Sequence, residues 1–367
     1  MRRKEHFIFK NGAELRNPIV MAPMTTYESA NNGTFSKKET AYYKARSIDV
    51  GMMITGCSAV SSNGYGFRNP LEITDDNLED FKHFTSEVKQ NGTKVILQLF
   101  HAGRMALREE LKEQPMISAS AVPAARPGAE TPKEMTQEEI LQMIQNFYEA
   151  TRRAIQAGFD GVELHGANTF LIQQFFSPHS NRRTDEWGGD LEKRSKFPLE
   201  VIKAALAAKK KYASEEFIIG YRISLEELEK PGITLDDSLF LIDKLADSGI
   251  DYLHLSLKKG YDQGSIIHTE DPTPIGKSVI EKVNGRIPVV GVSNIVTDSD
   301  MQGAFDFGYD LVAIGKAMIL NPRLLSKLDE GQQPREFFTI DEAEEELPKT
   351  LIEMIETVAS WSDIIKR

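Results

Sequence analysis

The stretch FDGVELHGANTFLIQQFFSPHSNRRTDEWGGDLEKR, residues 159–194, decides how this chain is organised. Its first part, Gly161–Leu164, is an apolar run with the composition of a buried strand. His165 and Asn168 follow this run, and a polar loop comes after them. Parallel α/β proteins carry their chemistry beyond the carboxyl ends of their strands. We therefore expect these two side chains at an active-site edge, where both can donate N–H groups to one oxygen that gains negative charge during a reaction.

Short apolar runs alternate with longer amphipathic stretches through the rest of the chain. Eight of the short runs are mostly apolar on both faces, as parallel strands covered by helices are. They are Pro18–Ala22, Met52–Thr55, Val95–Leu99, Gly161–Leu164, Phe217–Ile223, Tyr252–Leu257, Pro288–Gly291 and Leu311–Gly315. Eight strand–helix units predict an α/β protein with a single (β/α)8 TIM barrel. An open doubly wound sheet is the alternative, but no G-x-G-x-x-G motif follows an early strand.

The expected helices lie between these strands, and Thr136 with Glu139 forms a capping box at the start of one of them. They are Lys37–Ile48, Asn77–Asn91, Thr136–Ala157, Leu191–Tyr212, Leu235–Ser248, Ile275–Val283, Ser299–Phe307 and Pro322–Leu328. An Asn-Gly pair within residues 6–15 predicts an N-terminal hairpin ahead of the barrel.

We expect residues 1–331 to form the barrel and residues 332–367 to form a C-terminal helical extension packed on it. The extension contains an amphipathic segment, Leu351–Ile365, whose alternative role is a contact between the subunits of a homo-oligomer. Three long connections follow strand ends and therefore belong to the active-site face, which they could cover. They are Ser58–Asn77, His101–Met135 and Lys258–Pro274.

The composition narrows the function classes. The chain has 44 Lys and Arg against 55 Asp and Glu, a net charge of −11, which argues against a general nucleic-acid or anionic-membrane binder. The single cysteine, Cys57, rules out an internal disulfide framework and a Cys-ligated iron–sulfur cluster. No spacing of His, Asp and Glu is typical of metal ligands. Without a signal region or a long apolar segment, a cytoplasmic location is expected.

The sequence HGANTFLIQQFFSPHSNRRTDEWGG resembles the signature of the old yellow enzyme family of FMN-dependent NAD(P)H oxidoreductases. Further matches near residues 18–27, 98–104, 222, 291 and 315 extend the resemblance over nearly the whole chain. It implies noncovalent FMN on the carboxyl-terminal face of the barrel, with NADH or NADPH as reductant. Reduced flavin would pass hydride to a small electrophile, an enone, quinone or nitro compound, held by His165 and Asn168. In one departure, Phe170 stands where family members that reduce alkenes usually have a proton-donating Tyr.

The first two strand ends supply further expected site residues. The resemblance places Pro23, Met24 and Thr25 beside the flavin ring, with Thr25 bonded to its edge, and directs Tyr27 toward the substrate. From the residues alone, this segment reads as an ordinary strand-end turn and Tyr27 as a half-buried aromatic. Cys57 is expected near the flavin, either as a redox-tuning contact or as an inert, small apolar residue.

Two polar residues inside apolar strands also need partners. The Gln98 amide matches the donor and acceptor on the pyrimidine edge of a flavin, although neighbouring backbone could satisfy it equally well. Arg222 is a permanent cation in an apolar strand. The resemblance places it against the flavin, where it would stabilise the anionic reduced ring. A salt bridge to Glu163 inside the barrel is the alternative, and both interactions are compatible.

The phosphate site is expected after the last two strands. Loops after strands seven and eight commonly bind phosphate in such barrels, through backbone N–H groups and a helix N-terminus. Lys316 adds a positive charge there, in place of the Arg of many relatives. The expected set is Gly291, Val292, Ser293, Asn294, Gly315 and Lys316.

Three rival functions remain open from the sequence. The chain could reduce quinones, nitro compounds or free flavins without useful alkene activity. It could bind flavin with little catalysis, which the loss of the Tyr at Phe170 would permit. A flavin-free barrel lyase is the third, with Lys258 as its weak candidate for a Schiff base.

Overall fold

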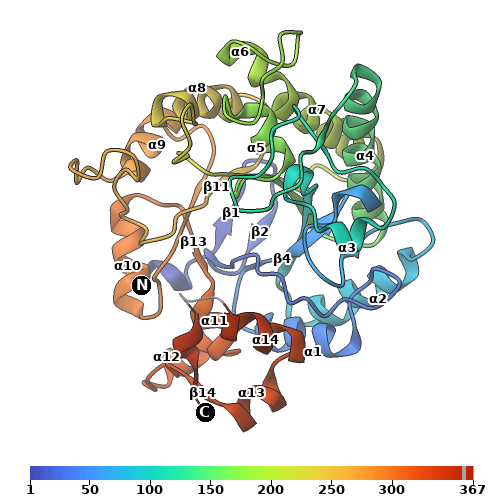
Figure 1. The fold of residues 1–367 in the computed structure, drawn as a ribbon. Helices are drawn as coiled ribbons and strands as arrows, with labels where there is room; N and C mark the ends of the chain where they lie inside the picture. Colours follow the sequence, from blue (N-terminus) through green and yellow to red (C-terminus); the bar gives the residue numbers. More distant parts are fainter. Residues whose placement is uncertain (358–360, 367) are drawn as a thin grey trace.

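The computed structural model of the chain describes residues 1–357 and 361–366. Within these residues the chain forms a closed barrel of eight parallel strands (Figure 1). The ring closes because the last strand, β13, pairs with the first, β3. The strands are β3 (Ile19–Met21), β4 (Met52–Ala59), β6 (Lys94–Phe100), β9 (Gly161–Gly166), β10 (Ile218–Ile223), β11 (Tyr252–Leu255), β12 (Val289–Val292) and β13 (Leu311–Ile314). The predicted (β/α)8 barrel is therefore confirmed.

Helices surround the barrel and cover its outer face (Figure 1). The predicted helices form with small shifts at their ends, and the one predicted at 191–212 divides into two. They are α1 (Lys37–Arg46), α2 (Leu78–Val88), α4 (Gln137–Gln156), α6 (Leu191–Arg194), α7 (Lys196–Tyr212), α8 (Leu235–Ala246), α9 (Ile275–Val283), α10 (Asp298–Phe307) and α12 (Leu324–Asp329). The predicted capping box is present, since Thr136 and Glu139 bond reciprocally at the start of α4.

The N-terminal hairpin pairs β1 (Phe7–Ile8) antiparallel with β2 (Glu14–Leu15), as predicted. Phe9, which is buried, lies 6.2 Å from the ring of Tyr252 at the start of β11. The hairpin therefore packs at the amino-terminal end of the barrel. Inside the barrel, a Cβ on Gly220 would lie only 2.0 Å from the Tyr252 ring, so the glycine makes room for this tyrosine.

Some short elements were not expected. Helices α5 (Leu171–Phe176) and α11 (Lys316–Leu320) begin soon after β9 and β13, in segments that the sequence analysis placed in loops or left unassigned. The long connections also contain α3 (Arg108–Leu111) and three strands, β5 (Leu71–Glu72), β7 (Ile117–Ser118) and β8 (Lys133–Glu134). Strand β5 pairs with β4, and β7 pairs with β8, which ties these segments down.

The C-terminal extension differs from an all-helical segment. It contains α13 (Ile340–Glu346) and α14 (Lys349–Thr357), but Ile365–Lys366 forms strand β15, which pairs in parallel with β14 (Phe338–Thr339). The amphipathic helix expected over 351–365 therefore does not reach its predicted end, and residues 358–360 lie outside the described residues. The division of the chain at residue 331 stays a prediction.

Candidate functional site

Three polar side chains occupy one row across the carboxyl ends of neighbouring strands. His165 on β9 pairs in register with Arg222 on β10, and Arg222 pairs with His254 on β11. Both histidines are buried, whereas Arg222 is half-buried. The row therefore brings together residues that are far apart in the sequence and places one cation, Arg222, between two hydrogen-bonding imidazole rings.

The ring of His165 is a neutral N–H donor. Burial, together with the charge of Arg222, holds its pKa well below the usual histidine range. The backbone N–H of Ala167 donates to its Nδ1 at 3.3 Å, so the ring proton resides on Nε2. The neutral ring can therefore offer its Nε2–H group to a ligand oxygen.

Asn168 is held by the ends of the two following strands. Its backbone N–H donates to Ser224 Oγ at 3.0 Å, and its side-chain oxygen accepts from Ser256 Oγ at 2.8 Å. The second contact leaves the amide NH2 group as the free donor of this exposed side chain. Asn168 and Thr169 have φ angles of 57° and 64°, a left-handed conformation that is rare for a β-branched residue and that clusters at functional sites.

Below this row, the Glu163 carboxylate is fully buried and fully partnered. It accepts hydrogen bonds from Gln98 Nε2 at 2.6 Å, Tyr252 OH at 3.0 Å and His254 Nδ1 at 2.8 Å. Burial alone would raise its pKa, but His254, Arg222 and Gln98 together hold the pKa at about 2. Burial lowers the pKa of His254, so we assign an ionised Glu163 beside a neutral His254.

Arg222 is the cation that the described residues leave without an ion-pair partner at the centre of the site. No ion pair within 4.0 Å joins its guanidinium to a carboxylate of the described residues, so its attraction to the charge of Glu163 acts over a longer distance. Its Nε is buried without a hydrogen-bond partner. A buried guanidinium N–H group without a partner can donate to a ligand that is anionic or carries carbonyl oxygens. FMN has both properties.

Gln98 is satisfied by side chains rather than by backbone. Its amide donates to Glu163, and its Oε1 accepts from Cys57 Sγ at 2.9 Å. The second N–H of the amide remains for a ligand. Burial raises the pKa of the Cys57 thiol to about 12, so the thiol is protonated and unreactive at neutral pH.

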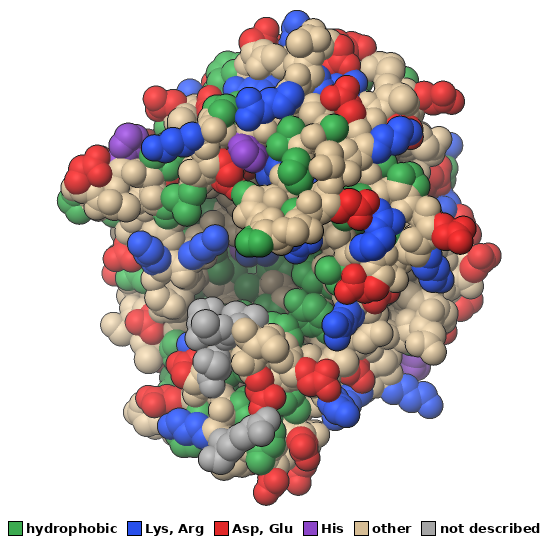
Figure 2. All heavy atoms as spheres, viewed as in Figure 1, with side chains coloured by type: hydrophobic (Ala, Val, Ile, Leu, Met, Phe, Trp, Pro, Cys, Tyr) green, Lys and Arg blue, Asp and Glu red, His purple; other side chains and the backbone are tan. Residues whose placement is uncertain are grey.

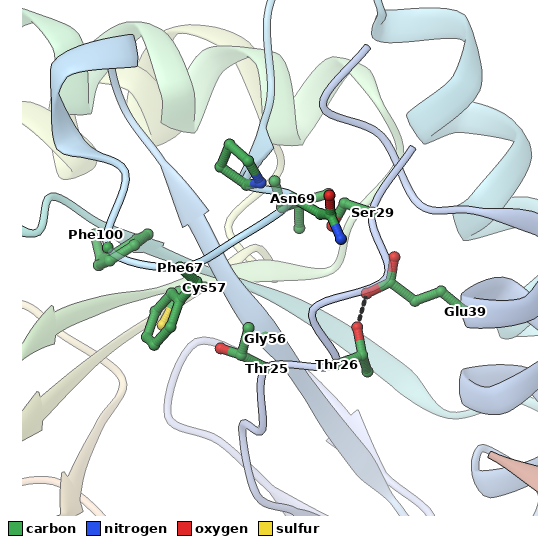
Figure 3. Close-up of a pocket in the computed structure, with 12 residues that line it drawn as sticks. Thr25, Thr26, Ser29, Glu39, Gly56, Cys57, Phe67, Asn69 and Phe100 are labelled. Atoms are coloured by element: carbon green, nitrogen blue, oxygen red, sulfur yellow. Dashed lines mark hydrogen bonds between the residues drawn. The ribbon is translucent and has the colours of Figure 1, made fainter. Parts of the chain in front are cut away.

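Thr25 lines a narrow pocket that reaches from the barrel interior toward helix α1 (Figure 3). Cys57, Phe67 and Phe100 line one end of this pocket, and Glu39 with Thr26 lines the other. Glu39 Oε1 accepts a short hydrogen bond from Thr26 Oγ1. A buried carboxyl group thus lies behind the strand-end turn that holds Thr25.

Aromatic rings form the opposite wall of the site. Phe170 is 9% exposed and meets the rings of His165 and Phe100 edge to face, at centroid distances of 5.0 and 5.1 Å. The ring centroid of Phe67 lies 5.9 Å from that of Phe170 and 5.5 Å from that of Tyr27. Burial raises the pKa of Tyr27, which keeps its hydroxyl protonated. Phe170 itself contributes no polar atom.

The predicted phosphate loops lie at the ends of β12 and β13. Ser293 and Asn294 have φ angles of 92° and 54°, a turn that can direct successive backbone N–H groups toward an anion. A Cβ on Gly291 would lie 2.3 Å from the Tyr309 ring, which explains the glycine. Lys316 is half-buried, and its Nζ lies 3.7 Å from Asp363 in the C-terminal extension.

The surface is hollowed at the centre of this barrel face, and hydrophobic side chains line much of the hollow (Figure 2). A cavity of about 210 Å³ adjoins it, and Asn168, Ser256 and Lys258 are among its lining residues. The structure therefore offers space for a small molecule next to Asn168.

Of the described helices, none combines the length and apolar composition that crossing a bilayer requires.

The polar loop after α5 is held by its own hydrogen bonds to backbone carbonyls. Asn181 donates to the carbonyls of Phe175 and Trp187, at 2.6 and 2.7 Å. Arg183 donates to the carbonyls of Ala119 and Met135, at 3.0 and 2.7 Å. These contacts give the polar side chains of this loop a structural role.

Sequence reasoning missed three members of the site. Tyr252 and His254 alternate with leucines in a short strand, and Glu39 lies on a helix where a glutamate normally faces solvent. Tyr252 and His254 could have been found, because polar side chains inside an apolar strand need buried partners. The sequence gives no comparable signal for Glu39.

Comparison with known proteins identifies the family. The family model described as NADH:flavin oxidoreductase / NADH oxidase matches residues 6–335. The chain is 43% identical to an NADH:acrylate oxidoreductase of Vibrio harveyi over 96% of this chain and 36% of that protein. It is 37% identical to a probable NADH-dependent flavin oxidoreductase of Bacillus subtilis over 97% of this chain and 96% of that protein.

The solved structures agree in fold. A morphinone reductase superposes with a TM-score of 0.76 at 24% identity, covering 96% of this chain and 91% of that chain. The chain spans about a third of the length of the Vibrio harveyi relative and of an NADH:fumarate oxidoreductase of Klebsiella pneumoniae, 36% of each. The family match covers most of this chain, and the barrel and its cationic, donor-rich mouth agree with it. The chain therefore belongs to the NADH:flavin oxidoreductase / NADH oxidase family, the old yellow enzymes.

Proposed function

We propose that this enzyme reduces small acceptors whose oxygen atom is held by His165 and Asn168, and that quinones and nitro compounds are better acceptors than simple enones. The observation that carries the proposal is the pair of fixed donors. The Nδ1 of His165 and the side-chain oxygen of Asn168 already have protein partners, which leaves the Nε2–H group of His165 and the NH2 group of Asn168 for a ligand. Two such donors stabilise an oxygen that becomes negative.

FMN supplies the hydride chemistry when bound, and the protein supplies orientation and charge. In the proposed arrangement, Thr25 and Gln98 bond the ring edge, and Arg222 stabilises negative charge on the ring. Residues 291–294 with Lys316 hold the phosphate. Pro23, Met24, Cys57, Val292 and Gly315 complete the cradle by packing. The unpartnered Nε of Arg222 supports this placement.

Phe170 favours acceptors that need no proton delivered to carbon. Hydride addition to an alkene leaves a carbanion-like carbon that must be protonated, and general acid catalysis of such a step is worth about 10²–10⁴-fold. Phe170 has no proton to give and packs among aromatic rings. Tyr27 is the nearby hydroxyl that could substitute. The acrylate and fumarate in the relatives' names make activated alkenes the alternative acceptors.

An acceptor panel tests the proposal. The purified holoenzyme is reduced anaerobically with NADH or NADPH, and its reoxidation by a quinone, a nitroarene, an enone and acrylate is followed by flavin absorbance. We expect fast reoxidation by the first two and slow reoxidation by the alkenes. Equally fast reoxidation by acrylate would favour activated alkenes as the acceptors of this enzyme.

A second measurement tests the cofactor placement. Lys316→Glu adds a negative charge beside the proposed phosphate site and should weaken FMN binding. The matched control is Lys327→Glu on α12, which makes the same charge change outside the proposed site. Full retention of flavin by Lys316→Glu after dilution and dialysis would show that the phosphate binds elsewhere.

A further inference from the structure

Glu39 is a buried carboxyl group that the structure leaves partly unpartnered. It lies in the first turn of α1 and is 3% exposed. Its Oε1 accepts from Thr26 Oγ1, whereas its Oε2 is buried without any hydrogen-bond partner. No Lys or Arg among the described residues forms an ion pair with it. A buried carboxylate in this position is costly, because its charge is neither solvated nor paired.

The surroundings of Glu39 connect it to the cofactor face. Its pocket is shared with Thr25, Gly56 and Cys57 (Figure 3). The titratable groups that face it are Glu28 on the loop after β3, Tyr42 and Tyr43 on α1, and Cys57 across the pocket on β4. Each of these is neutral or anionic near pH 7, so none stabilises a negative charge on Glu39.

Burial raises the pKa of Glu39 to about 7, and the charge of Glu28 adds to this rise. Hydrogen bonds from Thr26, from the Ser36 backbone and from Ser29 only partly oppose it. The group is therefore poised to gain or lose a proton near neutral pH, where a small change in local potential alters its charge. Glu163 is an internal contrast. It is equally buried, but its three donors keep it ionised.

We propose that Glu39 takes up one proton when the cofactor is reduced and releases it on reoxidation. The inference rests on the placement of FMN beside Thr25 proposed above. Reduction brings one hydride, two electrons and a proton, from NAD(P)H, and the added electron density disfavours a nearby carboxylate. The Glu39 carboxylate then binds a proton from solvent to become a carboxylic acid, and the reverse occurs when the hydride leaves. Glu39 acts through the electrostatic field and is not itself a catalytic residue.

The first test is the pH dependence of the flavin midpoint potential in the holoenzyme. One extra proton per two electrons adds a slope of up to about 30 mV for each tenfold change in proton concentration. We expect this extra slope in the wild type from about pH 6.5 to 8.5 and its absence in Glu39→Gln. Glu28→Gln, the matched control, should keep it. Thr26→Val should move the window to higher pH, because it removes a bond that favours the anion.

The second test needs no cofactor. Glu39 is harder to ionise in the folded chain than in the unfolded chain, so its penalty is absent below about pH 4.5 and complete above about pH 7. The Tm of apo Glu39→Gln should therefore exceed that of the wild type more at pH 8 than at pH 5. A constant difference would mean that Glu39 does not titrate there, and the proposal would fail.

The outcomes separate the inference from the placement of FMN. If Thr25→Ala shifts the potential but wild type and Glu39→Gln have parallel pH curves, the proton uptake is overturned and the placement stands. If Thr25→Ala leaves the potential unchanged, the placement itself is wrong. Should Glu39→Gln not fold, reduced-minus-oxidised infrared spectra of the wild type decide. A new carboxylic-acid C=O band supports the proposal, and no band overturns it.

Discussion

The mouth of the barrel has a polar half and an aromatic half. The polar half consists of Glu163, His165, Arg222 and His254 on β9, β10 and β11. Most of its polar atoms either bond a protein group or are N–H donors that a ligand can use. The aromatic half consists of Phe67, Phe100 and Phe170, with Cys57 packed beside them. The Phe170 ring meets the rings of Phe67 and Phe100 edge to face.

The difference indicates what each half can do for a substrate. The polar half can stabilise negative charge on an oxygen, because its donors are fixed and dry. The aromatic half excludes water and shapes the site, but it delivers no proton. We therefore expect the polar half to support hydride transfer to the acceptor, whereas neither half supplies a proton to carbon. The following changes test these two expectations.

The largest effect is expected at the base of the polar half. Glu163→Gln keeps the side-chain volume but removes the charge that Gln98, Tyr252 and His254 stabilise. The folded pKa of Glu163, about 2, is depressed, so its stabilisation is present above about pH 4.5 and is lost as pH falls toward 2. The shift corresponds to about 3 kcal/mol. Urea unfolding should show this loss at pH 7 and a smaller one at pH 3. Equal losses at both pH values would mean that packing, not charge, matters.

The next effect is expected at the donors. A His165→Ala, Asn168→Ala double variant should weaken binding of a phenolate by at least about 100-fold, since each of the two hydrogen bonds to a charged group contributes about 1.5–3 kcal/mol. The measurement is titration of the long-wavelength charge-transfer band over oxidised flavin. Ser256→Ala, which frees the Asn168 amide without removing it, should give a smaller loss. A band of undiminished affinity in the double variant would contradict the donor assignment.

Placing a hydroxyl in the aromatic half should have a smaller effect. Phe170→Tyr should raise the rate of enone reduction about tenfold, below the 10²–10⁴-fold range of an optimised acid, because the surrounding rings do not orient the new hydroxyl. Stopped-flow reoxidation by an enone measures this gain. The quinone rate should stay nearly constant. Rapid enone reduction by the wild type, unchanged in Phe170→Tyr, would show that another donor such as Tyr27 already serves.

The smallest effect is expected at Cys57. Cys57→Ala removes the bond from Sγ to Gln98, which should cost about 1 kcal/mol of unfolding free energy. If the thiol is only a packing residue, the flavin midpoint potential will not change. A shifted potential would instead establish Cys57 as a redox-tuning contact.

Much of this architecture could be predicted from the sequence, because each element carries its own local signal. The strand at 161–164 is apolar, and His165 follows it directly, so the strand end could be located without a structure. The partners of Glu163 could not, because they come from two other strands, β6 and β11, and meet only when the barrel forms. The buried state of Glu39 was hidden for a related reason. Its helix has the composition of an exposed one, and its carboxyl group is enclosed by distant segments, the loop after β3 and strand β4.

The pairing of β3 with β13 has a consequence for biosynthesis. Val312 pairs with Ile19, so the first barrel strand lacks one of its two neighbours until nearly the whole barrel has been translated. Contacts between such distant residues are slow to form, because a long loop must be ordered before they are made. The nascent chain therefore carries an open edge on the ribosome for most of its synthesis. The carboxyl-terminal face of the barrel can be completed only after the last strand emerges.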